Sequence, residues 1–65
     1  MDWEERVRKG VHDYIERYGS KYSVIARRAG ISRQMLYYWL NDQKNMSVEA
    51  IRRVQEVIEQ GLEEI

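Results

Sequence analysis

The stretch that decides the fold is Tyr22–Leu40, YSVIARRAGISRQMLYYWL. Ile25 and Ala29 lie one helical turn apart, and Ala26 between them is small enough to let a second helix cross close to it. Gly30 can adopt the left-handed backbone conformation that ends a helix and that a residue with a Cβ resists. The stretch therefore predicts a short first helix that stops at a glycine corner.

A second helix is predicted to begin directly after this corner. Ser32 can cap it with its hydroxyl. Its predicted buried side consists of Ile31, Met35, Leu36, Trp39 and Leu40. At 100° per residue, the outer side then consists of Arg33, Gln34, Tyr37, Tyr38 and Asn41. Two helices joined by a tight glycine turn form a helix-turn-helix, whose second helix reads DNA in many proteins.

The pattern Ala26-x3-Gly30-Ile31-Ser32, followed by Leu36 and Trp39-Leu40, resembles the helix-turn-helix of phage repressor and Cro-type regulators, and equally the DNA-reading part of some transposases. This resemblance implies a transcriptional regulator that binds palindromic double-stranded DNA as a dimer. It also implies that the loop at 41–45 approaches the sugar-phosphate backbone through Asn41, Lys44 and Asn45. Tyr22 departs from the pattern, since repressor-type members often have a phosphate-touching glutamine there. Its phenolic hydroxyl could do similar work, or the ring could belong to the core.

Helices are also predicted on both sides of the motif. Asp2 can cap a first helix in a capping box with Glu5, and an apolar stripe from Trp3 to Tyr18 predicts that this helix covers 3–18. Ser47 can cap the last helix, which begins at 48 and runs to 60 or beyond. With the motif helices at 21–29 and 33–41, the expected fold is all-α, a compact four-helix domain with a central helix-turn-helix. The predicted core residues are Val11, Ile15, Ile25, Ile31, Leu36, Trp39, Ile51, Val54 and Ile58.

Charge is unevenly distributed along the 65 residues, although eleven basic and eleven acidic residues cancel. Residues 20–45 carry five basic residues and one acidic residue. The flanking segments are acidic, above all the last twenty residues, with five glutamates and two arginines. We expect the basic segment to face phosphates and the acidic tail to lie elsewhere. The charged residues of the first helix are interpreted as a solvated face.

The outer side of the second motif helix carries the side chains that DNA reading requires. Arg33 can donate two hydrogen bonds to guanine O6 and N7, and Gln34 can both donate to and accept from adenine. Tyr37 and Tyr38 can reach a phosphate or a base edge, and we expect Tyr37 to face the groove. The predicted phosphate contacts include the first motif helix, whose N-terminal amides have no partner within the helix. These contacts are Lys21, Tyr22, Ser23, Ser32, Asn41, Lys44 and Asn45.

Several functional classes receive no support from the composition. There is no cysteine, and His12 is the single histidine, so we expect no metal site and no cofactor. No apolar run approaches the ~20 residues of a membrane span, and the N-terminus lacks the apolar segment of a secretory signal. We therefore expect a soluble, cytoplasmic protein with no membrane partner. Without a cysteine nucleophile, a second histidine, a glycine-rich phosphate loop or buried paired carboxylates, we also expect neither an enzyme nor a small-molecule substrate.

Three alternatives stay open at this point. A small helical protein-interaction module could use Tyr37 and Tyr38 as its partner surface. A homodimer could form through Leu62 and Ile65, the distal end of the last apolar stripe. The clean caps and the lack of proline and phenylalanine also follow design practice. The chain could therefore be an engineered mini-domain, which would weaken the inference to a dimer and a regulatory role but leave DNA binding intact.

Overall fold

Helices account for nearly all of the regular structure. The computed structural model describes residues 2–19 and 21–63, with side chains described as far as residue 60. In this part of the chain the elements are α1 (Trp3–Tyr18), α2 (Tyr22–Ala29), α3 (Arg33–Leu40) and α4 (Val48–Glu63), and no strand is present. The predicted all-α, four-helix fold is confirmed. The predicted bounds at 21 and 41 each differ by one residue, because Lys21 and Asn41 are cap residues.

Local chemistry sets the helix ends. Ser32 Oγ accepts a hydrogen bond from the Met35 amide at 3.0 Å, and Ser47 Oγ accepts one from the Ala50 amide at 3.2 Å. Gly30 ends α2 with φ 75°, the left-handed conformation that favours glycine. These three caps are as predicted from the sequence.

The capping box at the start of α1 was predicted incorrectly in part. Asp2 is the N-cap, but its carboxylate accepts from the amide of Glu4 at 3.2 Å. The Glu5 carboxylate accepts instead from Arg8 Nη1 at 3.4 Å. The physical reason is that an arginine one turn further along the helix offers Glu5 a charged donor.

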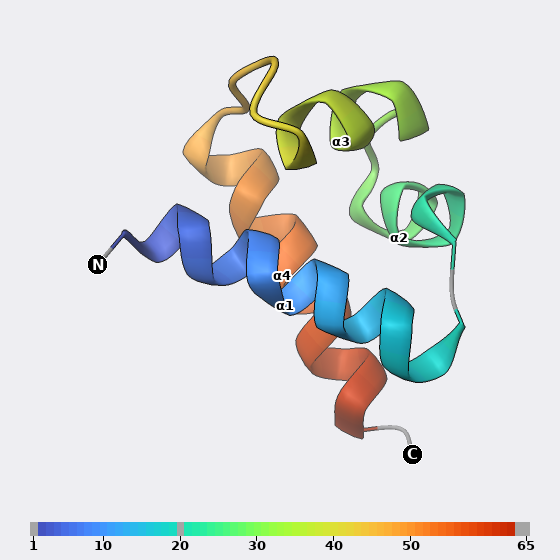
Figure 1. The fold of residues 1–65 in the computed structure, drawn as a ribbon. Coiled ribbons are helices and arrows are strands. Elements are labelled where there is room, and N and C mark those ends of the chain that lie inside the picture. The colour runs from blue at the N-terminus through green and yellow to red at the C-terminus, as the bar shows by residue number, and fades with distance from the viewer. Residues whose placement is uncertain (1, 20, 64–65) are drawn as a thin grey trace.

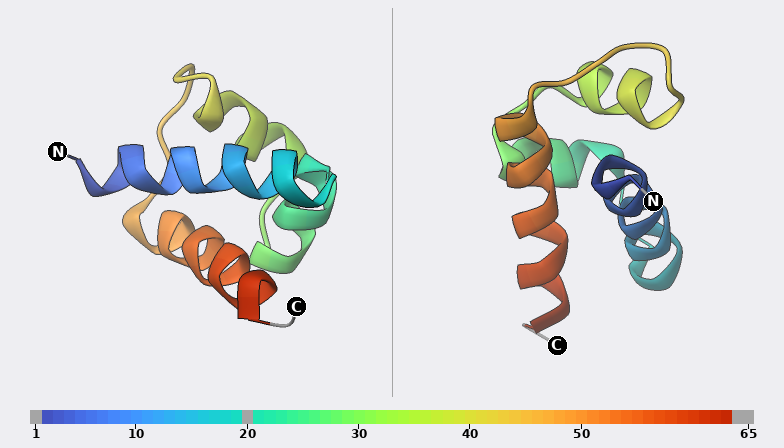
Figure 2. Two further views of the ribbon diagram at one scale, coloured as in Figure 1. Left: turned by 60° about the horizontal axis from the view of Figure 1, so that its bottom comes forward. Right: turned by 90° about the vertical axis from the view of Figure 1, so that its left-hand side faces the viewer.

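The two long helices, α1 and α4, cross at the centre of the molecule. The two short helices, α2 and α3, lie together on one side of this crossing (Figure 1). Gly10 of α1 lies at the crossing, where a Cβ would come within 2.9 Å of Ile58 Cδ1 of α4. Trp3 Nε1 also donates a hydrogen bond to Gln55 Oε1 at 3.1 Å, which ties α1 to α4. Figure 2 shows α4 running away from α3, so its C-terminal half lies at the opposite end of the molecule.

The core fills the space between all four helices. Its members are Val7, Val11, Ile25, Ala26, Ala29, Leu36, Trp39, Leu40, Ile51, Val54, Val57 and Ile58. Ile15 and Ile31 are half-buried and pack against this cluster, as does Tyr22. The apolar stripes read from the sequence therefore identify most of the core correctly.

Met35 and Val48 are apolar residues that lie outside the core, and for Met35 this contradicts the prediction. Met35 is 43% exposed, although it was predicted to lie on the buried side of α3. It lies 100° from Leu36 around the helix, beyond the arc that Leu36, Trp39 and Leu40 bury, so its side chain reaches the surface. Val48, which flanks the apolar stripe of α4 in sequence, is 61% exposed because it occupies the first turn, next to the loop.

The predicted dimer seam at Leu62 and Ile65 lies outside the residues whose side chains are described. Among the described residues, none of the helices combines the length and apolar character needed to cross a membrane. The same residues contain no group of three or more acidic, histidine or cysteine side chains that could hold a metal ion.

Candidate nucleic-acid interface

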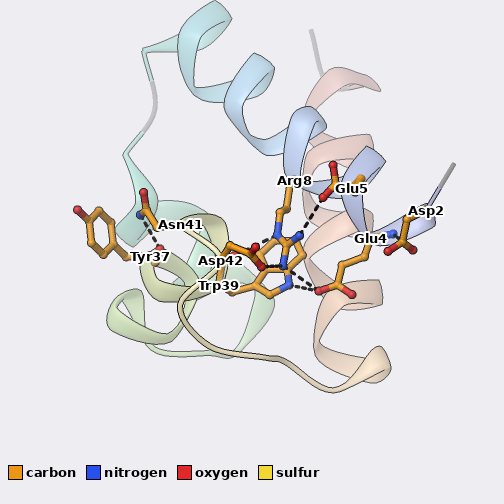
Figure 3. Close-up of polar contacts among 8 residues, drawn as sticks. All are labelled: Asp2, Glu4, Glu5, Arg8, Tyr37, Trp39, Asn41 and Asp42. Atoms are coloured by element: carbon orange, nitrogen blue, oxygen red, sulfur yellow. Dashed lines mark hydrogen bonds and ion pairs between the residues drawn. The ribbon is translucent and has the colours of Figure 1, made fainter.

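The outer side of α3 faces solvent. Arg33, Gln34 and Tyr37 are exposed, and Tyr38 is half-buried. Tyr37 projects from the opposite side of α3 to Trp39, whose ring is fully buried (Figure 3). The four residues predicted to read bases therefore share one accessible surface, and Tyr37 is the more exposed tyrosine, as expected.

A hollow of about 520 Å³ lies where this surface meets the start of α2, and its lining residues are Tyr22, Arg33, Gln34, Tyr37 and Tyr38. The rings of Tyr22 and Tyr37 meet edge to face, with centroids 5.8 Å apart, and Tyr37 meets Tyr38 in the same way at 6.0 Å. Tyr22 packs against the core, which is one of the two roles considered for it, and it also lines the hollow.

A second hollow of about 420 Å³ lies between α3 and the loop that follows it. It is lined by Ser32, Gln34, Met35, Tyr38, Lys44 and Asn45. Gln34 and Tyr38 line both hollows, and Gln34 Nε2 donates a hydrogen bond to the Tyr38 hydroxyl at 3.4 Å. These two side chains therefore form a ridge along α3, which we call the Gln34–Tyr38 ridge, with one hollow on each side.

Polar groups predicted to contact phosphates lie on both flanks of the Gln34–Tyr38 ridge. On the α2 flank, Lys21 is exposed at the N-cap and makes no side-chain cap hydrogen bond, and Ser23 is half-buried. On the loop flank, Lys44 Nζ lies 5.6 Å from the centre of the Tyr38 ring, and Asn45 lines the same hollow.

Asn41 and Ser32 have structural roles at the ends of α3. Asn41 Nδ2 donates to the Tyr37 carbonyl oxygen at 2.8 Å (Figure 3). Ser32 accepts the cap hydrogen bond from Met35 described above, and a hydroxyl that accepts in this way can still donate its own proton. Both residues are exposed. Both side chains could contact a phosphate while they cap α3. Their roles at the helix ends are, however, enough to explain why a serine and an asparagine stand at these positions.

A cluster around Arg8 holds the C-terminal end of α3, and this cluster was not predicted from the sequence. Arg8 Nε donates to the Trp39 carbonyl oxygen at 3.0 Å, and its guanidinium lies 4.9 Å from the centre of the Trp39 ring. Arg8 Nη2 contacts Glu4 Oε2 at 3.0 Å and Asp42 Oδ1 at 3.3 Å. Glu4 Oε2 also accepts from Trp39 Nε1 at 2.7 Å (Figure 3).

The interpretation of Arg8 as part of a solvated face is therefore wrong, because its side chain is only 15% exposed. The charged periodicity of α1 gave no signal for this role, since Trp39 and Asp42 lie more than 30 residues away from Arg8 in sequence. Asp42 has φ 60°, an uncommon value for a residue other than glycine, although aspartate tolerates it better than most. The Arg8 contact to Asp42, together with the bond from the Gln43 amide to the Tyr38 carbonyl oxygen at 2.8 Å, connects the start of the loop to α1 and α3.

The three-dimensional distribution of charge follows the one in sequence only in part, since Arg27 and Arg28 line a hollow beside Arg53 and Glu56 of α4. Asp42, the single acidic residue among residues 20–45, is paired with Arg8. On α4, Glu49 pairs with Arg53 at 2.8 Å, and Glu56 and Glu59 are exposed on the part of the helix that leads away from α3. The surface around the Gln34–Tyr38 ridge thus combines cationic and polar side chains with few acidic ones.

No family model, no curated protein and no solved structure matches this chain.

Proposed function

We propose that this chain binds double-stranded DNA sequence-specifically, with α3 in the major groove. The observation that carries the proposal is the free outer side of α3, where Arg33, Gln34 and Tyr37 are exposed on one short helix. The major groove is about 12 Å wide and admits a helix of this kind. In this position Arg33 would donate to guanine O6 and N7, and Gln34 would contact adenine.

The flanks of the Gln34–Tyr38 ridge support the same orientation. A helix in the major groove has a phosphate backbone on each side, and contacts to both fix its register. Lys21 and the first turn of α2 would meet one backbone, where the positive end of the helix dipole favours an anion. Lys44 and Asn45 would meet the other. A natural transcriptional regulator and an engineered DNA binder would use this surface in the same way.

Selection from a pool of random duplexes tests the proposal. The protein should enrich one short sequence that contains a guanine, and binding to it should weaken by roughly 0.9 log units per neutralised phosphate for each log unit of salt. The enriched site also tests the oligomeric state, since a palindrome indicates two copies and a single half-site indicates one. Failure to retain any duplex in dilute buffer would contradict the proposal.

A second candidate is a protein-interaction module, and it is favoured by the exposed ring of Tyr37, which packs against the half-buried ring of Tyr38. Exposed apolar side chains near one another on a small domain mark many contact sites. A partner bound through aromatic packing would respond weakly to salt, because no condensed counterions are released. The salt slope of the retained partner therefore separates the two functions.

A further inference from the structure

The hollow between α2 and α3 contains more aromatic surface than hydrogen bonding to bases requires. Tyr22 and Tyr37 form two of its walls, and Arg33 lies beside them. Tyr37 is 46% exposed, and its ring meets the rings of both Tyr22 and Tyr38 edge to face. Because both neighbours meet it edge to face, the aromatic surface is held in place before any ligand arrives.

We infer that this hollow receives the C5-methyl group of a pyrimidine in the major groove, thymine or 5-methylcytosine, next to the guanine that Arg33 reads. The inference rests on the proposed function. A methyl group has weakly positive hydrogen atoms, and the faces of tyrosine rings are negative, so their contact is attractive as well as apolar. In the major groove, the C5-methyl is the apolar group that a base pair presents.

The spacing of the residues limits where this pyrimidine lies. Arg33 and Tyr37 are four residues apart, which is about 6 Å along α3. Successive base pairs are separated by about 3.4 Å. The methyl-bearing base therefore lies within two base pairs of the guanine. Hydrogen bonds alone would not produce a preference for a methylated base, since the faces of the tyrosine rings carry no hydrogen-bond donor or acceptor.

Replacement of single dT residues by dU in the selected duplex tests the inference directly, because the change removes the methyl group and keeps base pairing. Loss of one buried methyl should weaken binding about fourfold. We expect this loss at a position within two base pairs of the guanine, measured by fluorescence anisotropy at fixed salt. If every dU duplex bound as tightly as its dT parent, the inference would be wrong.

Two variants of Tyr37 connect the effect to the hollow. In Tyr37→Ala the difference between dT and dU should disappear, whereas in Tyr37→Phe, which keeps the ring and removes the hydroxyl, it should persist. Tyr37 is exposed, so both variants should fold, and circular dichroism checks this. A Tyr37→Phe variant that also lost the difference would show that the hydroxyl makes the contact, and would overturn the inference.

A further experiment distinguishes thymine from 5-methylcytosine as the recognised base. Its results also distinguish failure of the methyl inference from failure of the proposed DNA binding. With cytosine at the sensitive position, 5-methylcytosine should bind about fourfold more tightly than cytosine if the hollow recognises the methyl group itself. Equal binding would overturn the claim for 5-methylcytosine and restrict the site to thymine. Retention of the duplex with no methyl effect at any position rejects the inference alone. Loss of all duplex binding rejects the proposed function and the inference with it.

Discussion

At the scale of single residues, Trp39 shows how a buried side chain constrains the surface. Its ring is fully buried, so its indole N–H needs an acceptor inside the protein. Glu4 supplies one at 2.7 Å from a different helix, and Arg8 in turn contacts that carboxylate. The direction of α3, and so the position of the exposed side chains on its other side, depends on this cluster.

Glu4→Ala should lower the free energy of unfolding by about 1–3 kcal/mol, because it leaves the indole N–H without its acceptor. Chemical denaturation followed by tryptophan fluorescence measures the loss. Glu5→Ala is the matched control, since Glu5 is 67% exposed and contacts only the outer edge of Arg8 at 3.4 Å. It should cost less than about 0.5 kcal/mol. Equal losses in both variants would contradict the assigned role of Glu4.

Arg33→Ala and Gln34→Ala should each weaken binding to the selected duplex by about 1–3 kcal/mol and relax the preference at one base pair. Lys44→Ala should weaken binding to all duplexes nearly equally, because a phosphate contact carries no sequence information. Competition binding against the selected duplex and point variants of it measures both effects. The distinction between reading and anchoring residues would fail if the three variants behaved alike.

At the scale of elements, the crossing of α1 and α4 explains a glycine inside a helix. Gly10 costs α1 about 1 kcal/mol relative to alanine in helix propensity. The short distance from its position to Ile58 explains why it is tolerated, since the side chain of Ile58 occupies the space that a Cβ would need.

Gly10→Ala alone should change stability by less than about 0.5 kcal/mol, because the gain in propensity is offset by an unfavourable rotamer of Ile58. In the background of Ile58→Val, which removes the Cδ1 atom, the same substitution should stabilise the protein by about 1 kcal/mol. A double-mutant cycle from denaturation midpoints measures the coupling. Strictly additive effects would show that the two positions do not interact.

At the scale of the whole molecule, zero net charge hides a polarity between the α3 end and the C-terminal half of α4. Such a molecule gains little from long-range attraction, so its orientation on a polyanion depends on the local basic surface. The double variant Glu56→Lys with Glu59→Lys raises the net charge from zero to plus four without touching α3.

This double variant should associate faster with every duplex at low salt and keep the same base preference, because the added charge acts at a distance from the reading surface. Stopped-flow association rates and the ratio of specific to nonspecific affinity measure the two properties. A changed base preference would place α4 in the interface and contradict the proposed orientation.

Local chemistry made most helix ends and apolar faces predictable. Ser32, Gly30 and Ser47 act within a few residues of themselves, so their roles can be inferred from sequence neighbours. The accessible side of α3 was predicted correctly because Leu36, Trp39 and Leu40 define its buried direction. Met35 was placed wrongly because it lies beyond that arc, so its side chain reaches the surface.

The sequence by itself determined four amphipathic helices, most of their caps and the segment with excess basic charge, since each follows from residues close together in the chain. Only the tertiary structure decided how the aromatic hollow and the Arg8 cluster form. The hollow needs Tyr22 of α2 beside Tyr37 of α3, and the cluster joins residues 4 and 8 to residues 39 and 42. Helical periodicity gives the face on which a side chain lies, but the crossing of distant helices selects its neighbours.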